Sequence, residues 1–233
     1  MTAKQSLSGQ RESQAKAFPE KAEKGKAFAG AHEIPENQES QSRKVRAYLK
    51  KAASDKVFPG CVLACGSPGE GKVSCFWAGQ RGLSRNREPV SSDLVYDLAS
   101  ITKVLSTTFL LAIAVNEGLV SLGSRLDGLG WPVPGSHKRL AIVDLLAHSS
   151  GLPAWRPYYL DKRLAERDRL IETILNEPKV SSVGGLTLYS DLNFILLGFV
   201  LEQVWDKDLK TLFSEKIAAP LGLVATGFRP DPL

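Results

Sequence analysis

The sequence predicts an α/β chain of the α+β kind, in which a mostly helical region accompanies a small antiparallel sheet that is incomplete in this chain. Three observations support this fold class. The 233 residues are 43% apolar and 24% charged, which is typical of a globular chain with a real core. Two short strand-like runs lie before residue 80 and are joined by a turn rich in Gly and Pro. Beyond residue 99 the apolar residues recur at helical spacing.

The first part of the chain is predicted to hold a tail, a helix and a hairpin. Residues 1–41 contain few bulky apolar side chains, so we expect a flexible polar tail that buries too little surface to offset its ordering entropy. A domain of residues 42–233 is expected to follow. Its sheet region, residues 42–98, holds a helix that begins near Ser42 and strands at residues 61–66 and 73–78.

The second part, residues 99–233, is predicted to be mostly helical. Residues 102–117 are apolar around most of the helix circumference, which predicts a buried helix that stops at Gly118. Further helices are expected at residues 142–147, 163–176, 192–204 and 209–217. No later segment has the alternation of a strand. Because a two-stranded sheet is barely stable alone, we expect its partner strands to be missing from this chain.

Composition and charge exclude several classes of protein. The longest uncharged apolar stretch, residues 104–115, is shorter than the roughly 20 residues of a membrane span. The polar start of the chain is unlike a signal peptide, so a cytoplasmic location is expected. The net charge of +5 comes from scattered basic residues, which indicates a solvated surface and no nucleic-acid partner.

Residues 66–72 read GSPGEGK and fit the phosphate-loop pattern GxxxxGK. Val73 stands where a hydroxyl would bind magnesium, and a strand rather than a helix follows. A Gly-rich hairpin turn is therefore favoured, and a nucleotide site remains the alternative.

Metal and disulfide sites are not predicted. His32, His137 and His148 have no ligand-like spacing, and His148 is interpreted as a hydrogen-bonding residue of a loop. The three cysteines, Cys61, Cys65 and Cys75, lie in strand-like runs without a CxxC pattern and are interpreted as small apolar residues. A disulfide of Cys75 across the hairpin is the alternative.

Ser100 and Lys103 form the first candidate for chemistry. Ser100 falls where a loop turns into the apolar helix, and Lys103 lies one turn further on the same face. Apolar surroundings lower the pKa of a lysine from about 10.4, so a neutral Lys103 could accept the Ser100 proton and make the hydroxyl nucleophilic. A serine helix cap followed by an exposed lysine is the alternative interpretation.

Tyr189 and Asp191 stand at a second junction between a loop and a helix, some ninety residues downstream. A phenol can act as a second proton carrier when a nearby cation lowers its pKa from about 10. A half-buried aromatic for Tyr189 and a helix cap for Asp191 are the structural alternatives.

Four segments, in order, resemble motifs of one family. They are YDLASITK at 96–103, DLLAHSSGLP at 144–153, YSD with FILLG at 189–198, and PLGL with TGF at 220–228. The chain thus resembles, over about residues 45–230, the serine β-lactamase-like hydrolases. These include class C β-lactamases, D-alanyl-D-alanine carboxypeptidases and esterases of the same scaffold. The resemblance implies a β-lactamase/transpeptidase-like fold.

The resemblance also implies roles for the four residues. Ser100 corresponds to the acylated nucleophile, Lys103 to its proton acceptor and Tyr189 to a general acid/base. Asp191, where many relatives carry Asn, would position Lys103 and the substrate, and its charge favours a protonated Lys103. The implied function is a serine hydrolase of small-molecule esters or amides, including β-lactam-like carbonyls, without metal or organic cofactor.

The family's third motif, Lys/His-(Ser/Thr)-Gly on a later strand, has no counterpart here. In the family that strand supplies the second N–H of the oxyanion hole. The sequence therefore leaves two hypotheses: a serine hydrolase, with esterase favoured over peptidase because peptidoglycan lies outside the cytoplasm, or a catalytically inactive remnant or binding protein of the same family.

Overall fold

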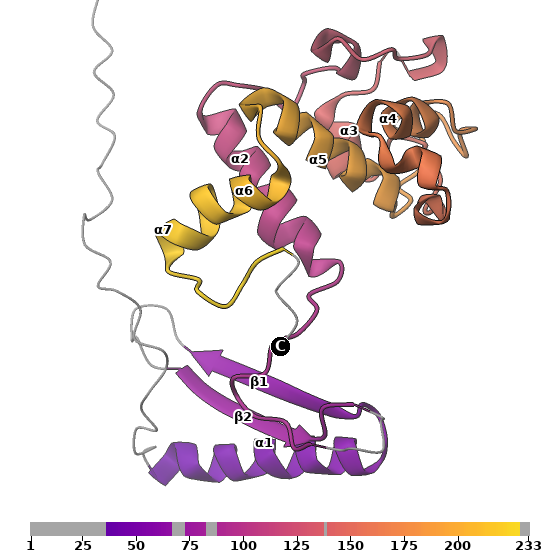
Figure 1. Cartoon of the computed structure of the whole chain (residues 1–233). Helices are drawn as coiled ribbons and strands as arrows, with labels where there is room; N and C mark the ends of the chain where they lie inside the picture. Colours follow the sequence, from indigo (N-terminus) through magenta and orange to yellow (C-terminus); the bar gives the residue numbers. More distant parts are fainter. Residues whose placement is uncertain (1–35, 67–72, 83–87, 138, 229–233) are drawn as a thin grey trace, which may run out of the picture. The chain divides into compact units, whose positions relative to one another are not determined.

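The computed structural model describes residues 36–66, 73–82, 88–137 and 139–228. Within these residues the chain forms two compact units, one of residues 36–99 and one of residues 100–228. The first unit holds the sheet and the second the helices (Figure 1).

The sheet unit consists of one helix and one hairpin. Helix α1 (Glu36–Ser54) packs against strand β2 (Val73–Gly79), which pairs antiparallel with β1 (Gly60–Gly66) (Figure 1). The register places Gly60 opposite Gly79 and Gly66 opposite Val73. The predicted hairpin is confirmed to within one residue at its open end. Residues 67–72, with most of the GxxxxGK pattern, lie outside the described residues.

The predicted boundary of the polar tail is wrong at its end, because α1 begins at Glu36 and not near Ser42. Residues 36–41 are helical without bulky apolar side chains. Polar residues such as Glu and Gln are good helix formers, and an ion pair one turn apart, Arg43 Nη2 to Glu39 Oε1 at 2.7 Å, supports this end of the helix. The apolar pattern alone could not reveal this extension.

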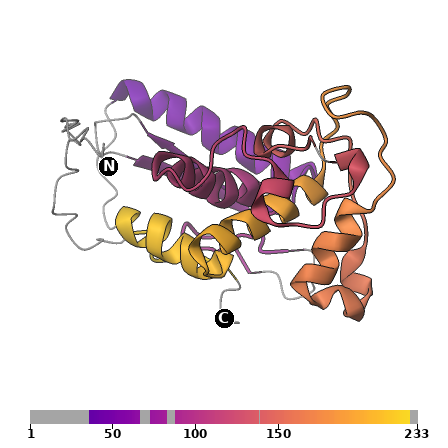
Figure 2. The ribbon, with the colours of Figure 1, turned by 90° about the horizontal axis from the view of Figure 1, so that it is seen from above.

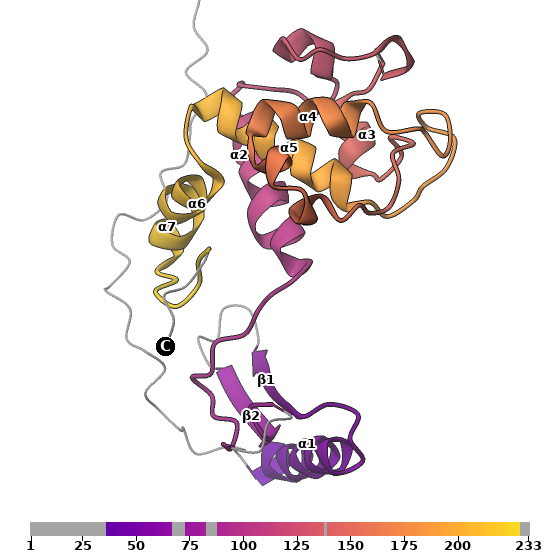
Figure 3. The same cartoon turned by 45° about the vertical axis from the view of Figure 1, so that its right-hand side comes forward.

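Helix α5 (Asp191–Trp205) is the centre of the helical unit. Helices α2 (Phe109–Asn116), α3 (Ile142–Leu146) and α4 (Arg167–Leu175) pack against it (Figures 1 and 3). Its predicted apolar circumference is confirmed by burial on several sides. The residues of α5 that are at most 1% exposed are Leu192, Asn193, Leu196, Leu197, Val200 and Leu201.

The remaining helical segments surround this centre. Helix α6 (Leu209–Phe213) continues through the π-helical segment η6 (Ser214–Ala218) into α7 (Ala219–Leu221), the yellow run in Figure 2. The predicted helix at 209–217 is thus confirmed and extends to residue 221. Short 3₁₀ turns occupy Leu126–Leu129, Gly135–His137, Tyr158–Leu160 and Lys162–Ala165. Extended backbone at Glu166 (ψ 126°) divides the predicted helix 163–176 into a 3₁₀ turn and α4.

The predicted helix at 102–117 is present, and it contains a π-helical segment that the sequence did not predict. In this segment, η1 (Lys103–Thr108), the Thr108 hydroxyl donates to the Lys103 carbonyl at 2.9 Å. Within the helical unit, Leu110, Leu111 and Ala114 of the following α2 are buried, and η1 and α2 both pack against α5.

Candidate active site

Ser100 stands at the start of the helix that carries η1 and α2, where the sequence placed it. The preceding residue, Ala99, has a positive φ of 43°, which is uncommon for a residue with a side chain. The Ala99 N–H donates to Asp97 Oδ1 at 2.8 Å, which supports this conformation. Strained backbone of this kind is frequent beside functional groups, and here it immediately precedes the candidate nucleophile.

Lys103 joins the two predicted junctions. Its Nζ donates to Ser100 Oγ at 3.2 Å and to Asp191 Oδ1 at 2.7 Å, across 88 residues of sequence. It also lies 5.1 Å from the centre of the Tyr189 ring. The Lys103 side chain is only 16% exposed, whereas that of Asp191 is 40% exposed. The structure thus brings all four predicted site residues together around one ammonium group.

The ionisation of Lys103 differs from the sequence-based expectation. Burial acts to lower its pKa, as predicted, but hydrogen bonds with Asp191 and Tyr189 and their charges outweigh burial and raise it. The direction agrees with the expectation that Asp191 favours a protonated Lys103, and it does not favour the neutral form that could accept the Ser100 proton. Burial alone does not set the pKa of Lys103, because the Asp191 carboxylate is in contact with its ammonium group.

The pKa of Tyr189 is shifted in the opposite direction. Hydrogen bonds with Ser100 and Lys103 lower the pKa of its phenol, and the Lys103 charge adds to this effect, while burial and the Asp191 charge oppose it. The side chain is 52% exposed and so accessible to a ligand. Of the two proton carriers predicted from the sequence, Tyr189 is the one whose pKa is lowered.

Buried polar side chains behind the site hold its two loops together. Ser150 Oγ donates to Asn193 Oδ1 at 2.6 Å, and Ser190 Oγ donates to the Pro153 carbonyl at 2.6 Å. Ser150, Ser190 and Asn193 are each at most 1% exposed. These three residues lie within the motifs of the sequence, but no role was predicted for them. The signal that could have found them is a polar residue inside an otherwise apolar helix, as Asn193 is in α5.

His148 is a hydrogen-bonding residue of a loop, as predicted. Its Nδ1 accepts the Ser190 backbone N–H at 3.1 Å. Its ring lies against Tyr189, with 4.6 Å between ring centres, and against Phe194, at 5.2 Å. His148 is therefore part of the surroundings of Tyr189.

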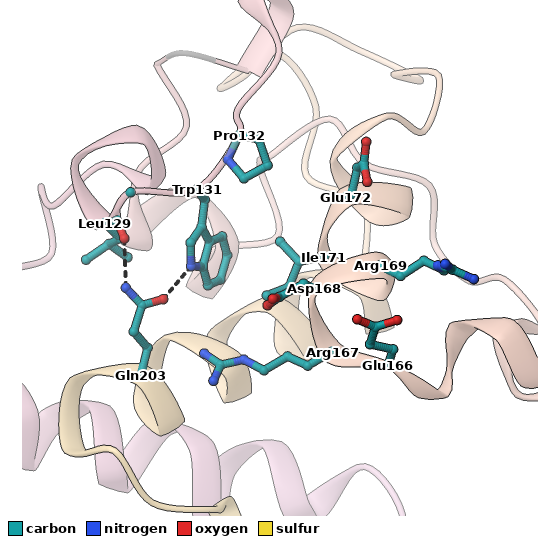
Figure 4. A pocket seen from close by; sticks show the side chains of 11 residues that line it. Leu129, Trp131, Pro132, Glu166, Arg167, Asp168, Arg169, Ile171, Glu172 and Gln203 are labelled. Atoms are coloured by element: carbon teal, nitrogen blue, oxygen red, sulfur yellow. Dashed lines mark hydrogen bonds between the residues drawn. The ribbon is translucent and has the colours of Figure 1, made fainter.

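A separate cavity of about 670 Å³ lies between the start of α4 and the segment 129–132 (Figure 4). Trp131 Nε1 donates to Gln203 Oε1 at 2.5 Å, and Gln203 Nε2 donates to the Leu129 carbonyl at 2.7 Å, as the dashed lines in Figure 4 show. Arg167 Nη2 is bound to the Phe199 carbonyl at 2.9 Å. None of the four site residues lines this cavity, and three of its polar side chains already bond within the chain.

Two predictions outside the site can be compared with the structure. Cys61, Cys65 and Cys75 are free thiols, so the alternative of a disulfide at Cys75 is not realised. Among the described residues, no helix has both the length and the apolar character needed to cross a lipid bilayer.

The four gathered residues are a serine and a lysine at one helix junction and a tyrosine and an aspartate at the other. Together with the matching family model and solved structures, they define the class of protein as one with a β-lactamase/transpeptidase-like fold. Residues 44–233 match the family model described as Beta-lactamase, and the chain belongs to that family. The predicted resemblance is thereby confirmed.

Curated relatives agree with this assignment. A protein of Escherichia coli K12 that is provisionally named a D-alanyl-D-alanine carboxypeptidase is 35% identical over 150 residues, which cover 58% of this chain and 34% of that protein. A protein of the same provisional name from Salmonella typhimurium LT2 is 32% identical over 154 residues, covering 60% and 35%. The chain thus spans about a third of the length of these relatives.

Solved structures show the same fold. A class C beta-lactamase from Rhodobacter sphaeroides aligns with a TM-score of 0.62 and 26% identity over 76% of this chain and 48% of that chain. A D-amino acid amidase from Ochrobactrum anthropi SV3, complexed with L-phenylalanine amide, aligns with a TM-score of 0.67 and 22% identity over 78% and 50%. An octameric penicillin-binding protein homologue from Pyrococcus abyssi gives 0.65 and 21% over 78% and 43%.

Proposed function

We propose that this chain carries the acylation site of a serine hydrolase that acts on ester or amide carbonyls through an acyl-enzyme on Ser100. The observation that carries the proposal is the position of Lys103 Nζ, 3.2 Å from Ser100 Oγ and 2.7 Å from Asp191 Oδ1. A cation held in this place lies beside both the nucleophile and Tyr189. Membership of the Beta-lactamase family supports the same chemistry.

In the acylation step, Tyr189 as phenolate accepts the Ser100 hydroxyl proton while Ser100 Oγ bonds to the substrate carbonyl carbon. The resulting oxyanion is stabilised by the Ser100 backbone N–H, one of the unpaired donors at a helix start. When the tetrahedral intermediate collapses, the bond to the leaving alkoxide or amine breaks, and the leaving group takes the proton from Tyr189. The product is an ester of Ser100.

Deacylation follows the same path in reverse. A water molecule gives its proton to Tyr189 and bonds to the acyl carbon, and Ser100 Oγ leaves and recovers the proton. Throughout both steps Lys103 stays protonated, because its pKa is raised, and its charge stabilises the Tyr189 phenolate. Asp191 is a positioning residue that holds the ammonium group in place. We therefore assign the role of proton acceptor to Tyr189, whereas the resemblance implies Lys103.

The substrate class is proposed from the chemistry and the relatives together. The relatives are named as a D-alanyl-D-alanine carboxypeptidase, a D-amino acid amidase and a beta-lactamase, and each name refers to the cleavage of an amide bond. The panel we propose therefore holds a p-nitrophenyl ester, a chromogenic cephalosporin, D-phenylalanine amide and a peptide that ends in D-Ala-D-Ala.

The first experiment asks whether Ser100 is nucleophilic in the chain of 233 residues. The purified protein is incubated with a fluorophosphonate, and the intact mass and the labelled peptide are measured. One adduct per chain on Ser100 is expected, with none on Ser100→Ala. Ser54→Ala, at an exposed serine in α1, is the matched control and should label like the wild type. Folded protein without an adduct would refute the proposal and favour a binding protein of the same family.

A further inference from the structure

Tyr189 is held on both sides by one residue, His148. The Leu188 N–H donates to the His148 carbonyl at 2.9 Å, and the Ser190 N–H donates to His148 Nδ1 at 3.1 Å. The residues before and after Tyr189 are therefore both hydrogen-bonded to His148. Its ring also lies against the Tyr189 ring, with 4.6 Å between ring centres. These three contacts fix the backbone and the ring of the proposed proton acceptor.

The backbone of His148 is suited to this double contact. It has a positive φ of 56° in the loop after α3. The next glycine, Gly151, has a φ of 80°, and a Cβ there would meet the Ser181 carbonyl oxygen at 2.2 Å. The loop is thus folded tightly, and both the carbonyl and the ring of His148 contact the same neighbouring segment, residues 188–190.

The hydrogen bonds also define the form of the imidazole. A nitrogen that accepts a backbone N–H carries no proton, so the ring proton of His148 is on Nε2 and the ring is neutral. Asn193 Nδ2 is a second donor, 3.3 Å from Nδ1. The Asn193 amide is oriented by Ser150, which donates to its Oδ1 at 2.6 Å. Two donors thus face Nδ1, and a proton there would lose both contacts.

Most of the surroundings of the ring lower the pKa of His148. Burial lowers the pKa of His148, the Lys103 charge on η1 lowers it further, and Asp191 at the start of α5 opposes them. The third titratable group against the ring, Tyr189, lies in the loop before α5. The neutral form is therefore the resting form near pH 7.

We propose that His148 is a positioning residue for acylation at Ser100. As a neutral imidazole it accepts the Ser190 N–H and so fixes Tyr189 beside Lys103. The inference rests on the proposed function, since it assigns a role in that reaction. Nothing in the geometry requires His148 to touch a substrate. Its contribution is the alignment of Tyr189, and a small displacement of a catalytic group is enough to slow a reaction by about 10²-fold.

A matched pair of variants isolates the acceptor at Nδ1. Asn and Gly both tolerate a positive φ, and neither carries a ring. His148→Asn keeps an oxygen acceptor near the position of Nδ1, whereas His148→Gly has none. Because both variants lose the ring contact with Tyr189, the difference between them reports on the acceptor that faces the Ser190 N–H and Asn193 Nδ2.

The measurement is the rate of fluorophosphonate labelling of Ser100 in the full chain, from pH 5 to 9. We expect His148→Gly to label about 10²-fold more slowly than wild type and His148→Asn within about tenfold of it. The wild-type rate should also fall as His148 gains a proton below its ordinary pKa of about 6.5, and His148→Asn should lack this fall. A role limited to folding would change the yield of folded protein but not this pH dependence.

The outcomes separate the two proposals. Equal rates for His148→Asn and His148→Gly would overturn the positioning role and leave the proposed function intact. A wild type that does not label at Ser100 would overturn the proposed function and this role with it. Nitrogen chemical shifts of the wild-type imidazole provide a check that needs no variant. An unprotonated Nδ1 at pH 8 supports the inference, and a protonated one refutes it.

Discussion

Replacing the carboxylate of Asp191 tests how its charge sets the pKa values of Lys103 and Tyr189. Asp191 Oδ1 accepts from Lys103 Nζ at 2.7 Å, and its charge acts on both proton carriers in the same direction. It raises the pKa of Lys103 and opposes the lowering of the pKa of Tyr189. In Asp191→Asn the oxygen acceptor remains and the charge is removed, so the pKa values of both groups should fall. In Asp191→Ala the acceptor is removed as well.

The expected loss of rate follows from the exposure of the pair. A hydrogen bond to a charged group contributes about 1.5–3 kcal/mol, and each 1.4 kcal/mol corresponds to a factor of ten. Asp191 is 40% exposed, so water partly replaces the lost oxygen, and the lower end applies. Asp191→Ala should therefore label Ser100 about tenfold more slowly. Asp191→Asn keeps an oxygen acceptor for the charged Lys103 Nζ and loses only the charge of the acceptor, so at the pH of its maximal rate it should be slower by only about threefold.

The assay is the fluorophosphonate labelling rate measured from pH 6 to 10.5. A deprotonated Tyr189 is needed for reaction, so the rate rises with pH through its pKa, and it falls again when Lys103 loses its proton. In Asp191→Asn both the rise and the fall of the rate should move to lower pH. Glu117→Gln, which changes an acidic partner of Lys216 outside the site, is the matched control. A rise and a fall that stay in place, or move to higher pH, would refute the assignment of charges.

Three further predictions follow from the same contacts. Tyr189→Phe should slow labelling by about 10²–10⁴-fold and leave the melting temperature nearly unchanged, because the ring is half exposed. Asn193→Leu should lower the free energy of unfolding by about 1–3 kcal/mol in urea titrations, since Ser150 loses its buried acceptor, whereas the exposed Asn176→Leu should not. The raised pKa of Lys103 stabilises the fold below about pH 10.5, and this contribution is lost as pH rises through the folded value. Above pH 10.5 the melting temperature of the wild type should therefore fall by more than that of Lys103→Met.

Much of the secondary structure could be predicted from local sequence patterns. Alternation and a Gly-rich turn were sufficient for the hairpin of β1 and β2, and an apolar circumference was sufficient for α5. At residues 102–117 the same pattern predicted a helix but not the π-helical segment η1 within it. A hydrophobic pattern indicates which side chains could be buried and does not specify the hydrogen-bonding register of the helix.

The site could be predicted in its residues but not in its protonation. Ser100 and Lys103 are one helical turn apart, so their contact follows from helix geometry. The contact of Lys103 with Asp191 spans 88 residues and depends on how α5 packs against η1. That contact reverses the effect of burial on the pKa of Lys103. A sequence indicates which groups are titratable, and only the packing of distant elements decides which of them carries the proton.

Hydrogen bonds of polar residues connect the tyrosine motif to the loop at 148–153. Tyr189 is half exposed and lies against the His148 ring. The next residue, Ser190, adds two hydrogen bonds, from its N–H to His148 and from its hydroxyl to Pro153. Both acceptors belong to the 148–153 loop. A change in that loop should therefore alter the reactivity of Ser100 even though the loop need not contact the reacting atoms.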